Sequence, residues 1–177
     1  PLIFRYPNVI KENSITNQAV HCIDFLPTLA DLAGVDITTL KKKDGGKPKY
    51  DGASFAKVLK GEAERISRNN LFWHLPGYMD ERFSPTTLIQ TRVGEEYFKL
   101  FYFYETEEFE MFNITKDISE KRNILKNPSS KEMEIALQMN TDMLAWLKTN
   151  NAPTGTWVKN KEKVTYPKVD GVKNYQK

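Results

Sequence analysis

The sequence predicts an α+β fold in which a small antiparallel sheet of about four strands is packed by a long C-terminal helix. Between residues 71 and 114, short segments rich in aromatic and β-branched residues alternate with turn-like stretches. Connections this short can join only antiparallel strands. From Ser129 or Ser130 to about Lys148, apolar residues recur at helical spacing, and Pro153 follows. The two patterns together predict a sheet with one helix across it.

The expected strands are LFWH, TTLIQTR, YFKLFYFY and FEMFNI, and turn-like stretches at Pro76–Gly77, VGEE and ETEE separate them. YFKLFYFY is apolar on both faces of its pleat apart from Lys99. A strand of this kind is typical of a central position, so we expect a helix to cover it.

The first third of the chain predicts a strand followed by helices. PLIFRYP, at Pro1–Pro7, is a short apolar run closed by proline, which is typical of a buried strand that ends in a turn. AVHCIDFLPTLADLAGV predicts a helix that begins near Asp24 and ends at Gly34. After a polar loop from Asp36 to Asp51, GASFAKVLKG predicts a second helix with Ser54 as its N-cap.

Length and charge limit the classes of protein. A chain of 177 residues fits one domain, or one domain with an appended piece. Its formal net charge of +3 is too small to argue for nucleic acid, and its densest basic cluster, Lys41–Tyr50, is interpreted as a solvated loop. No apolar run is long enough to span a bilayer. Because the chain begins at Pro1 without a signal sequence, we expect it to be part of a longer polypeptide.

The chain shows no motif that would complete an active site. No Gly-rich loop follows a strand, and no histidine pair has the spacing of metal ligands. Asp117, Glu120 and Asn123 are closely spaced, but a turn that caps the next segment explains them more simply than a calcium site. Cys22 is the single cysteine, which excludes an internal disulfide, and its apolar neighbours predict a buried structural thiol.

Both histidines lie near the end of an expected element. His21 precedes the first helix and is expected to be a core or capping residue. His74 lies in the aromatic run LFWHLPGY, and two interpretations stay open. It is either a packed residue whose imidazole bonds to backbone, or a donor at a cleft rim aimed at a polar or anionic ligand. Composition alone favours the packed residue.

Taken in order, the segments resemble the C-terminal part of the type I, formylglycine-dependent sulfatases of the alkaline-phosphatase-like superfamily. AVHCIDFLPTLADLAGV is similar to the family pattern V..VD..PTLLDLAGI, which is the most specific match. NNLFWHLPGY resembles WH.P.Y, with His74 on the family histidine and Gly77 where many members carry a second one. The other matching segments are PLIFRYPN, YDGASFAKVLKGE, SPTTLIQTRVGEEYFKLFYFYE and FEMFNITKDISEKRNILKNP, so that the resemblance runs from Pro1 to Leu147.

The resemblance implies how the chain is divided. Residues 1–62 would be the incomplete end of the large α/β domain, residues 63–153 the C-terminal subdomain with its sheet and helix, and residues 154–177 a tail. The whole protein would hydrolyse sulfate esters, of sulfated carbohydrates above all. This chain would supply scaffold and a wall of the substrate cleft, with His74 as a substrate contact.

The resemblance also implies where the chemistry lies. Family members use a formylglycine nucleophile and a calcium ion, both held by motifs upstream of the matched segments. We therefore expect no catalytic residue, no metal ligand and no cofactor in this chain, and we expect the isolated chain to be inactive. A periplasmic or extracellular location is implied in the same way.

The expected partner of the chain is the missing N-terminal domain, and a sulfated small molecule or glycan is the expected substrate of the whole enzyme. No nucleic-acid partner and no membrane span are expected. Without the N-terminal domain, apolar side chains at Leu2, Ile3, Phe4, Phe25 and Leu29 would be uncovered, so we expect the fragment to self-associate.

Two alternatives stay open. The first is a non-catalytic carbohydrate-binding or interaction module, with Trp73, Tyr78 and Trp157 stacked on sugar rings and lysines paired with sulfate groups. The second is a fragment of a related phosphoester or phosphonate hydrolase. Residues upstream of Pro1 would distinguish this second alternative from a sulfatase.

Overall fold

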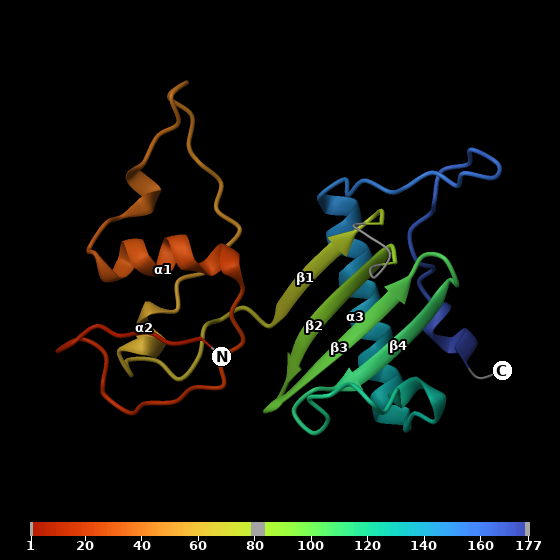
Figure 1. Ribbon diagram of the computed structural model, residues 1–177, viewed down its shortest axis with the longest axis horizontal. Helices are drawn as coiled ribbons and strands as arrows, with labels where there is room; N and C mark the ends of the chain where they lie inside the picture. The colour runs from red at the N-terminus through yellow and green to blue at the C-terminus, as the bar shows by residue number, and fades with distance from the viewer. Residues whose placement is uncertain (1, 79–83, 176–177) are drawn as a thin grey trace. The chain divides into compact units, whose positions relative to one another are not determined.

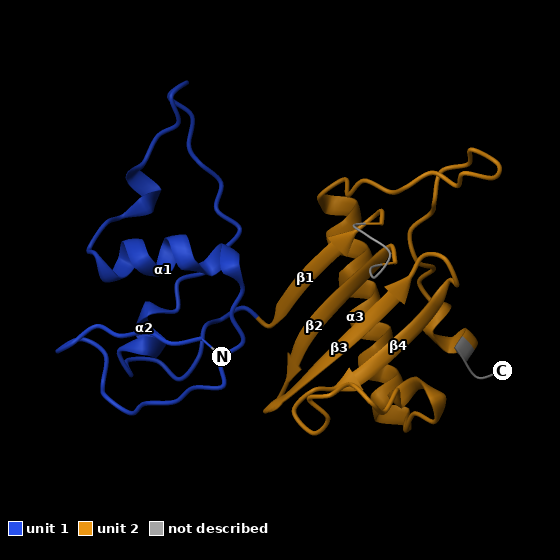
Figure 2. Cartoon of the chain, in the orientation of Figure 1, with its two compact units in different colours: residues 1–68 blue, residues 69–177 orange. Residues whose placement is uncertain are grey.

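The computed structural model describes residues 2–78 and 84–175 of the chain. They form two compact units, Pro1–Arg68 and Asn69–Lys177, coloured blue and orange in Figure 2. The first unit ends a few residues beyond the boundary expected at residue 62. The expected tail from residue 154 belongs to the second unit.

The first unit is built around the predicted helix α1 (Phe25–Leu32), shown in Figure 1. A short 3-10 turn, η1 (Cys22–Asp24), leads into it, and Gly34 closes it at φ 72°. This left-handed conformation is the common end of a helix and is open to glycine at no steric cost. The sequence therefore predicted both ends of this helix correctly.

The second predicted helix is also present, as α2 (Ala56–Leu59), with the 3-10 turn η2 (Ile37–Thr39) between the two helices. The prediction of Ser54 as the N-cap was one residue early, but its hydroxyl oxygen accepts a hydrogen bond from the N–H of Ala56 at 3.2 Å and so satisfies a free donor at the helix start. Phe55, at the N-cap position itself, makes no side-chain cap.

The strand predicted for Pro1–Pro7 is not formed in the part of this segment that the structure describes. Residues 2–6 are irregular and a turn begins at residue 7. A strand needs a hydrogen-bonded neighbour, and the described chain contains no segment that pairs with this one. The apolar composition of the segment predicted burial, but composition alone does not show whether a neighbouring strand is present.

The interior of the first unit is partly polar, because Asp24 is completely buried there. Its carboxylate accepts hydrogen bonds from the backbone N–H groups of His21 at 2.8 Å and Ala53 at 2.9 Å, and from both terminal nitrogens of Arg68 at 2.6 Å. Burial alone would raise the pKa of Asp24, but the bonds from Arg68, His21 and Ala53 outweigh it and hold the pKa below its usual range.

The second unit is an antiparallel meander with one long helix across it (Figure 1). Its strands are β1 (Asn70–Leu75), β2 (Thr86–Val93), β3 (Glu96–Phe103) and β4 (Glu108–Asn113), in the order β1-β2-β3-β4. The predicted sheet is thereby confirmed, including the central place of the YFKLFYFY segment in β3.

The long helix α3 (Ser130–Thr149) covers one face of this sheet (Figure 1). It starts where predicted because Ser129 and Glu132 form a capping box, in which each side chain bonds to the backbone of the other residue. Alternate residues of the strands and the inner stripe of the helix form the main core, which includes Ile89, Phe98, Leu100, Tyr102, Met111, Met139, Met143 and Leu147.

The tail packs onto the second unit. Beyond the short turn η3 (Ile124–Lys126) and α3, the chain returns along the sheet to η4 (Gly171–Tyr175). The side-chain amide of Asn140 donates to the carbonyl oxygens of Lys168 at 2.7 Å and Val169 at 2.8 Å. None of the described helices combines the length and the apolar character that a bilayer crossing needs.

Candidate functional site

His74 lies near the end of β1, opposite Thr87 of β2. Its Nε2 is 2.6 Å from the carbonyl oxygen of Pro153, and its Nδ1 is 2.7 Å from the hydroxyl oxygen of Thr87. A carbonyl can only accept, so Nε2 carries a proton and donates it. In the neutral ring Nδ1 then accepts from the Thr87 hydroxyl, and both ring nitrogens are engaged within this unit.

The hydrogen bonds continue beyond the histidine. The Thr87 oxygen is 2.8 Å from the hydroxyl oxygen of Tyr104. Because Thr87 donates to His74, it accepts from Tyr104, so the protons point in one direction from tyrosine to threonine to histidine. Burial raises the pKa of Tyr104, which keeps this tyrosine a neutral donor.

Aromatic rings surround the imidazole of His74. Its ring packs edge-to-face on Tyr104 at 6.2 Å and on Trp146 at 6.4 Å between ring centroids, and Trp146 in turn stacks on Phe72 at 5.0 Å. The packed interpretation of His74, with its bond to a backbone carbonyl, is therefore seen in the structure. A direct contact with substrate stays a prediction.

Two exposed groups lie along the chain just after His74. Tyr78 is 64% exposed, and its hydroxyl donates to the carboxylate of Glu105. That hydrogen bond raises the pKa of Tyr78. Gly77, where a second family histidine was expected, has open space around the position that a side chain would take.

The prediction for His21 is confirmed and the prediction for Cys22 is not. His21 is the N-cap of η1 and forms a capping box with Asp24, so the capping role expected for it is confirmed. Cys22 is exposed, and the prediction of a buried thiol was wrong. The turn at η1 points Asp24 into the unit and leaves Cys22 outside. Apolar neighbours in sequence could not reveal that a carboxylate takes the inner position.

The polar group after β4 caps a turn, as predicted. Asp117 accepts from the backbone N–H of Arg122 at 2.8 Å, Glu120 accepts from the ammonium group of Lys99 at 2.6 Å, and Asn123 caps η3. Each of these side chains already has a partner inside the unit. Within residues 2–78 and 84–175, no three His, Cys, Asp or Glu side chains gather so that they could hold a metal ion. The described residues therefore do not fit a calcium site.

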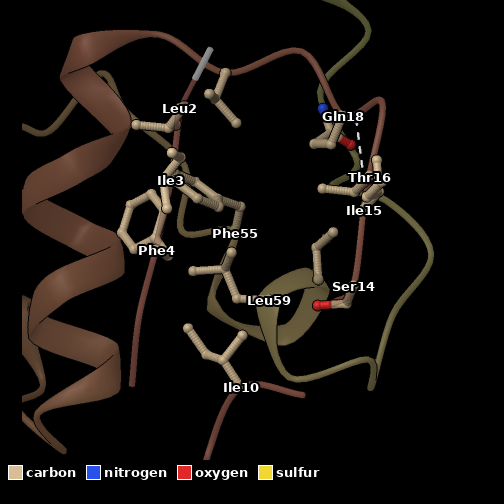
Figure 3. A pocket seen from close by; sticks show the side chains of 12 residues that line it. Leu2, Ile3, Phe4, Ile10, Ser14, Ile15, Thr16, Gln18, Phe55 and Leu59 are labelled. Atoms are coloured by element: carbon tan, nitrogen blue, oxygen red, sulfur yellow. Dashed lines mark hydrogen bonds between the residues drawn. The ribbon is translucent and has the colours of Figure 1, made fainter. Parts of the chain in front are cut away.

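The first unit has an apolar cavity of about 480 Å³, seen from close by in Figure 3. Its apolar lining includes Leu2, Ile3, Phe4, Ile10, Ile15, Val20, Phe55, Val58 and Leu59. The polar residues at its rim bond within the unit: Ser14 donates to the carbonyl oxygen of Lys11, and Gln18 accepts from the N–H of Ile66. The cavity can bury apolar groups but offers no converging set of reactive groups.

Replacement of Thr87 by valine is expected to cost about 1–3 kcal/mol of unfolding free energy. Valine keeps the shape of threonine but leaves His74 Nδ1 and the Tyr104 hydroxyl without this partner. Urea unfolding followed by tryptophan emission measures the loss, since Trp73, Trp146 and Trp157 all lie in the second unit.

A matched control is Thr91→Val on the same strand. The hydroxyl of Thr91 is buried and has no hydrogen-bond partner within the described chain. Its removal is expected to leave stability unchanged or to raise it. Equal losses for the two variants would contradict the role assigned to Thr87.

The comparisons with known proteins agree over most of the chain. A family model described as "N-sulphoglucosamine sulphohydrolase, C-terminal" matches residues 1–147. A "Sulfatase" from Formosa agariphila is 50% identical over 181 residues, which cover 100% of this chain and 32% of the relative. An "N-acetylglucosamine-6-O-sulfatase" from Bacteroides thetaiotaomicron is 31% identical over 70% of this chain and 21% of its own length.

A solved structure also matches. It is that of a protein in complex with its substrate D-glucosamine-2-N,6-O-disulfate, and it shares 26% identity with a TM-score of 0.64 over 84% of this chain and 28% of its own chain. The chain thus spans about a third or less of the length of each of these three proteins.

Proposed function

Because the chain belongs to the sulfatase family, as a C-terminal portion, we propose that it serves a longer enzyme that hydrolyses sulfate esters of carbohydrates. The match to the family over residues 1–147 carries this proposal. Two relatives support a carbohydrate as the substrate, since one is named for a 6-O-sulfated N-acetylglucosamine and another holds a sulfated glucosamine. In this enzyme the chain would supply scaffold and one wall of the substrate cleft.

The test compares the full-length protein with the isolated chain. We expect the full-length protein to release sulfate from a 6-O-sulfated N-acetylglucosamine and the isolated chain to release none. The described residues offer no metal-binding cluster, and the nucleophile motif of the family is absent from the sequence. Metal-dependent turnover of an aryl sulfate by the isolated chain would overturn the scaffold role. Absence of turnover by the full-length protein would overturn the sulfatase assignment.

Calcium and formylglycine, which the resemblance implies, are proposed to be held by the part of the longer protein outside this chain. The side chains of Asp117, Glu120 and Asn123 are engaged in capping and ion pairing, which supports this division. Metal analysis should then find calcium bound to the full-length protein and none bound to the isolated chain after dialysis.

Replacement of His74 by alanine in the full-length enzyme is expected to raise KM or change substrate preference, with a modest loss of kcat. His74 bonds to the backbone of Pro153, just before the tail, so its loss would loosen the cleft wall without removing a reacting group. Steady-state kinetics on two sulfated sugars measure the change. Complete loss of turnover at saturating substrate would contradict this prediction.

The outer face of α1 is proposed to pack against the rest of the longer protein. Helix α1 buries polar side chains, Asp24 beside its start and Thr28 within it, while Leu26 and Leu29 are 56% and 55% exposed. Leucines that are more than half exposed are unusual on a helix whose outer face meets water. About two thirds of the Formosa relative lies outside the part matched here, which is chain enough to cover this face.

Without that cover the isolated chain is expected to self-associate. Light scattering over a range of concentrations should give a mass above 20.5 kDa, because exposed apolar surface of this kind associates in water. Leu26→Glu with Leu29→Glu should restore the monomer mass. Ile118→Glu with Val158→Glu, at residues 80% and 83% exposed in the second unit, is the matched control and should not. A monomer at high concentration would contradict the prediction.

A periplasmic or extracellular location is proposed for the longer protein. Polymeric sulfated glycans lie outside cells, so an enzyme that acts on them would be exported. Fractionation of the producing cells, with an antibody against this chain, tests the proposal. Recovery in the cytoplasmic fraction alone would overturn it.

A further inference from the structure

The tail of the second unit carries a short basic hairpin, residues 155–164, that lies after the region matched by the family model. Thr156 and Lys163 pair in antiparallel fashion, and the N–H of Val164 donates to the carbonyl oxygen of Gly155 at 2.9 Å. In Figure 1 it is the blue loop at the upper right that extends away from the sheet. These bonds bring the two arms of the loop together.

Both ends of the basic hairpin are tied to the unit. Before it, Nε2 of His74 donates to the carbonyl oxygen of Pro153. After it, the hydroxyl of Tyr166 donates to the carbonyl oxygen of Ala152 at 2.6 Å, and Tyr166 packs against the main core. A Cβ at Gly155 would lie 3.0 Å from the carbonyl oxygen of Pro76, so the hairpin passes closely over the end of β1. It is therefore held next to the segment that carries Tyr78.

The charges of the basic hairpin are not balanced. Lys159, Lys161 and Lys163 are all exposed, and the part of the chain that the structure describes pairs none of them with a carboxylate. The one acidic residue of the hairpin, Glu162, accepts from the side-chain amide of Asn160 at 2.7 Å. An anionic ligand would supply the counter-charge that the hairpin lacks.

The conformation of Lys161 adds a second observation. Its φ is 61°, in the left-handed region that glycine and asparagine adopt more readily than lysine. A lysine at this position keeps its charge at the expense of backbone strain. Glu107 and Glu120 share this conformation, so it places the Lys161 side chain at the turn without by itself assigning it a role.

An aromatic ring accompanies the lysines. Trp157 is half-buried at the base of the hairpin, and Val158 beside it is 83% exposed. An indole face can stack on the C–H groups of a sugar ring, and lysine ammonium groups form charge-assisted hydrogen bonds with sulfate oxygens. We propose that the basic hairpin binds a sulfated glycan chain at a site outside the family domain. The choice of a glycan among polyanions rests on the proposed function.

The test measures binding of dextran sulfate to the 177-residue chain at two salt concentrations, with uncharged dextran and a DNA duplex as comparison probes. The triple variant Lys159→Ala, Lys161→Ala, Lys163→Ala is expected to lose affinity for dextran sulfate at least about tenfold. The control triple Lys41→Ala, Lys42→Ala, Lys43→Ala removes the same charge from an exposed loop of the first unit and should lose less than about twofold. Equal losses of affinity in the two triple variants would mean that dextran sulfate binds by net charge alone, and would overturn the proposed site.

A single variant separates binding from folding. Lys161→Gly removes one charge and relieves the left-handed strain, so the thermal midpoint should not fall while the affinity for dextran sulfate falls severalfold. Unchanged affinity would overturn the role of Lys161. Equal binding of uncharged dextran, or tighter binding of the DNA duplex, would overturn a sulfated glycan as the ligand.

The outcome is distinguishable from failure of the proposed function, because binding is measured without turnover. In the full-length enzyme the hairpin triple should raise KM for a sulfated polysaccharide and leave kcat/KM for a small aryl sulfate unchanged. Loss of dextran sulfate binding in the triple variant, combined with a full-length protein that cleaves no sulfate ester, would leave the binding site standing and overturn the sulfatase assignment alone.

Discussion

Gly52→Ala is expected to destabilise the first unit by about 3 kcal/mol or more. A Cβ at this position would lie 2.0 Å from the carbonyl oxygen of Ile23 and 3.0 Å from the Cα of Asp24. Both are backbone atoms of the turn that leads into α1, so no side-chain rotation can relieve the overlap. The segment 52–55 would have to move away from α1, which would break the bond from the N–H of Ala53 to Asp24.

The first unit has no tryptophan, so tryptophan emission cannot follow its unfolding. Hydrogen exchange of backbone amides measures the change instead. Amides of α1 should lose protection in the Gly52 variant, while those of β3 keep theirs. Gly77→Ala is the control, since no atom lies within 4 Å of the position its Cβ would take. Its effect should stay within about 0.5 kcal/mol. Unchanged protection of α1 in Gly52→Ala would contradict the close approach seen at Gly52.

Arg68→Met is expected to cost the first unit about 3–5 kcal/mol at neutral pH. Arg68 places both terminal nitrogens at 2.6 Å from the two oxygens of Asp24, whose side chain is completely buried. Methionine retains much of the volume but leaves a buried carboxylate without its counter-ion. Arg65→Met is the matched control three residues earlier. Arg65 lies at the surface and pairs with Glu64, which is 79% exposed, so this substitution should cost no more than about 1 kcal/mol.

The pH dependence of Arg68→Met has a definite sign. In the native protein the pKa of Asp24 is lowered, so its ionised form contributes stability above the unfolded pKa of about 3.9 and loses it as pH falls through the folded pKa. In Arg68→Met burial acts with less opposition and raises the pKa of Asp24. Protonation then relieves the unpaired charge. The difference in stability between the two proteins should be smaller at pH 4 than at pH 7, as measured by exchange of the α1 amides. A difference that grows on acidification would contradict this account.

Much of the second unit could be predicted from local sequence. The meander followed from aromatic and β-branched segments separated by turn residues, and α3 followed from its capping box and its apolar stripe. These signals act over a few residues, through backbone sterics and neighbouring hydrogen bonds, so they are visible in the sequence. The contacts of His74 are different. Its acceptor at Pro153 lies 79 residues away, and no spacing rule connects the two.

The first unit shows the same division. Sequence patterns placed α1 and α2 and both of their ends, but they did not reveal which side of α1 faces inward. Asp24 and Thr28 are the buried residues, and Cys22 with Leu26 and Leu29 lies outside. The expected strand at Pro1–Pro7 is missing in the described residues because the chain offers it no neighbour. Burial and strand pairing depend on what lies opposite a segment, which its own composition does not encode.

By itself, the sequence determined the two helices of the first unit, the sheet and long helix of the second, and membership of the sulfatases, because each of these follows from short patterns along the chain. Only the tertiary structure decided that His74 is packed and bonded, that Asp24 is buried in the first unit, and that the tail forms a basic hairpin. The reason is physical. Hydrogen bonds between distant residues form only when the whole chain brings their atoms within about 3 Å of one another.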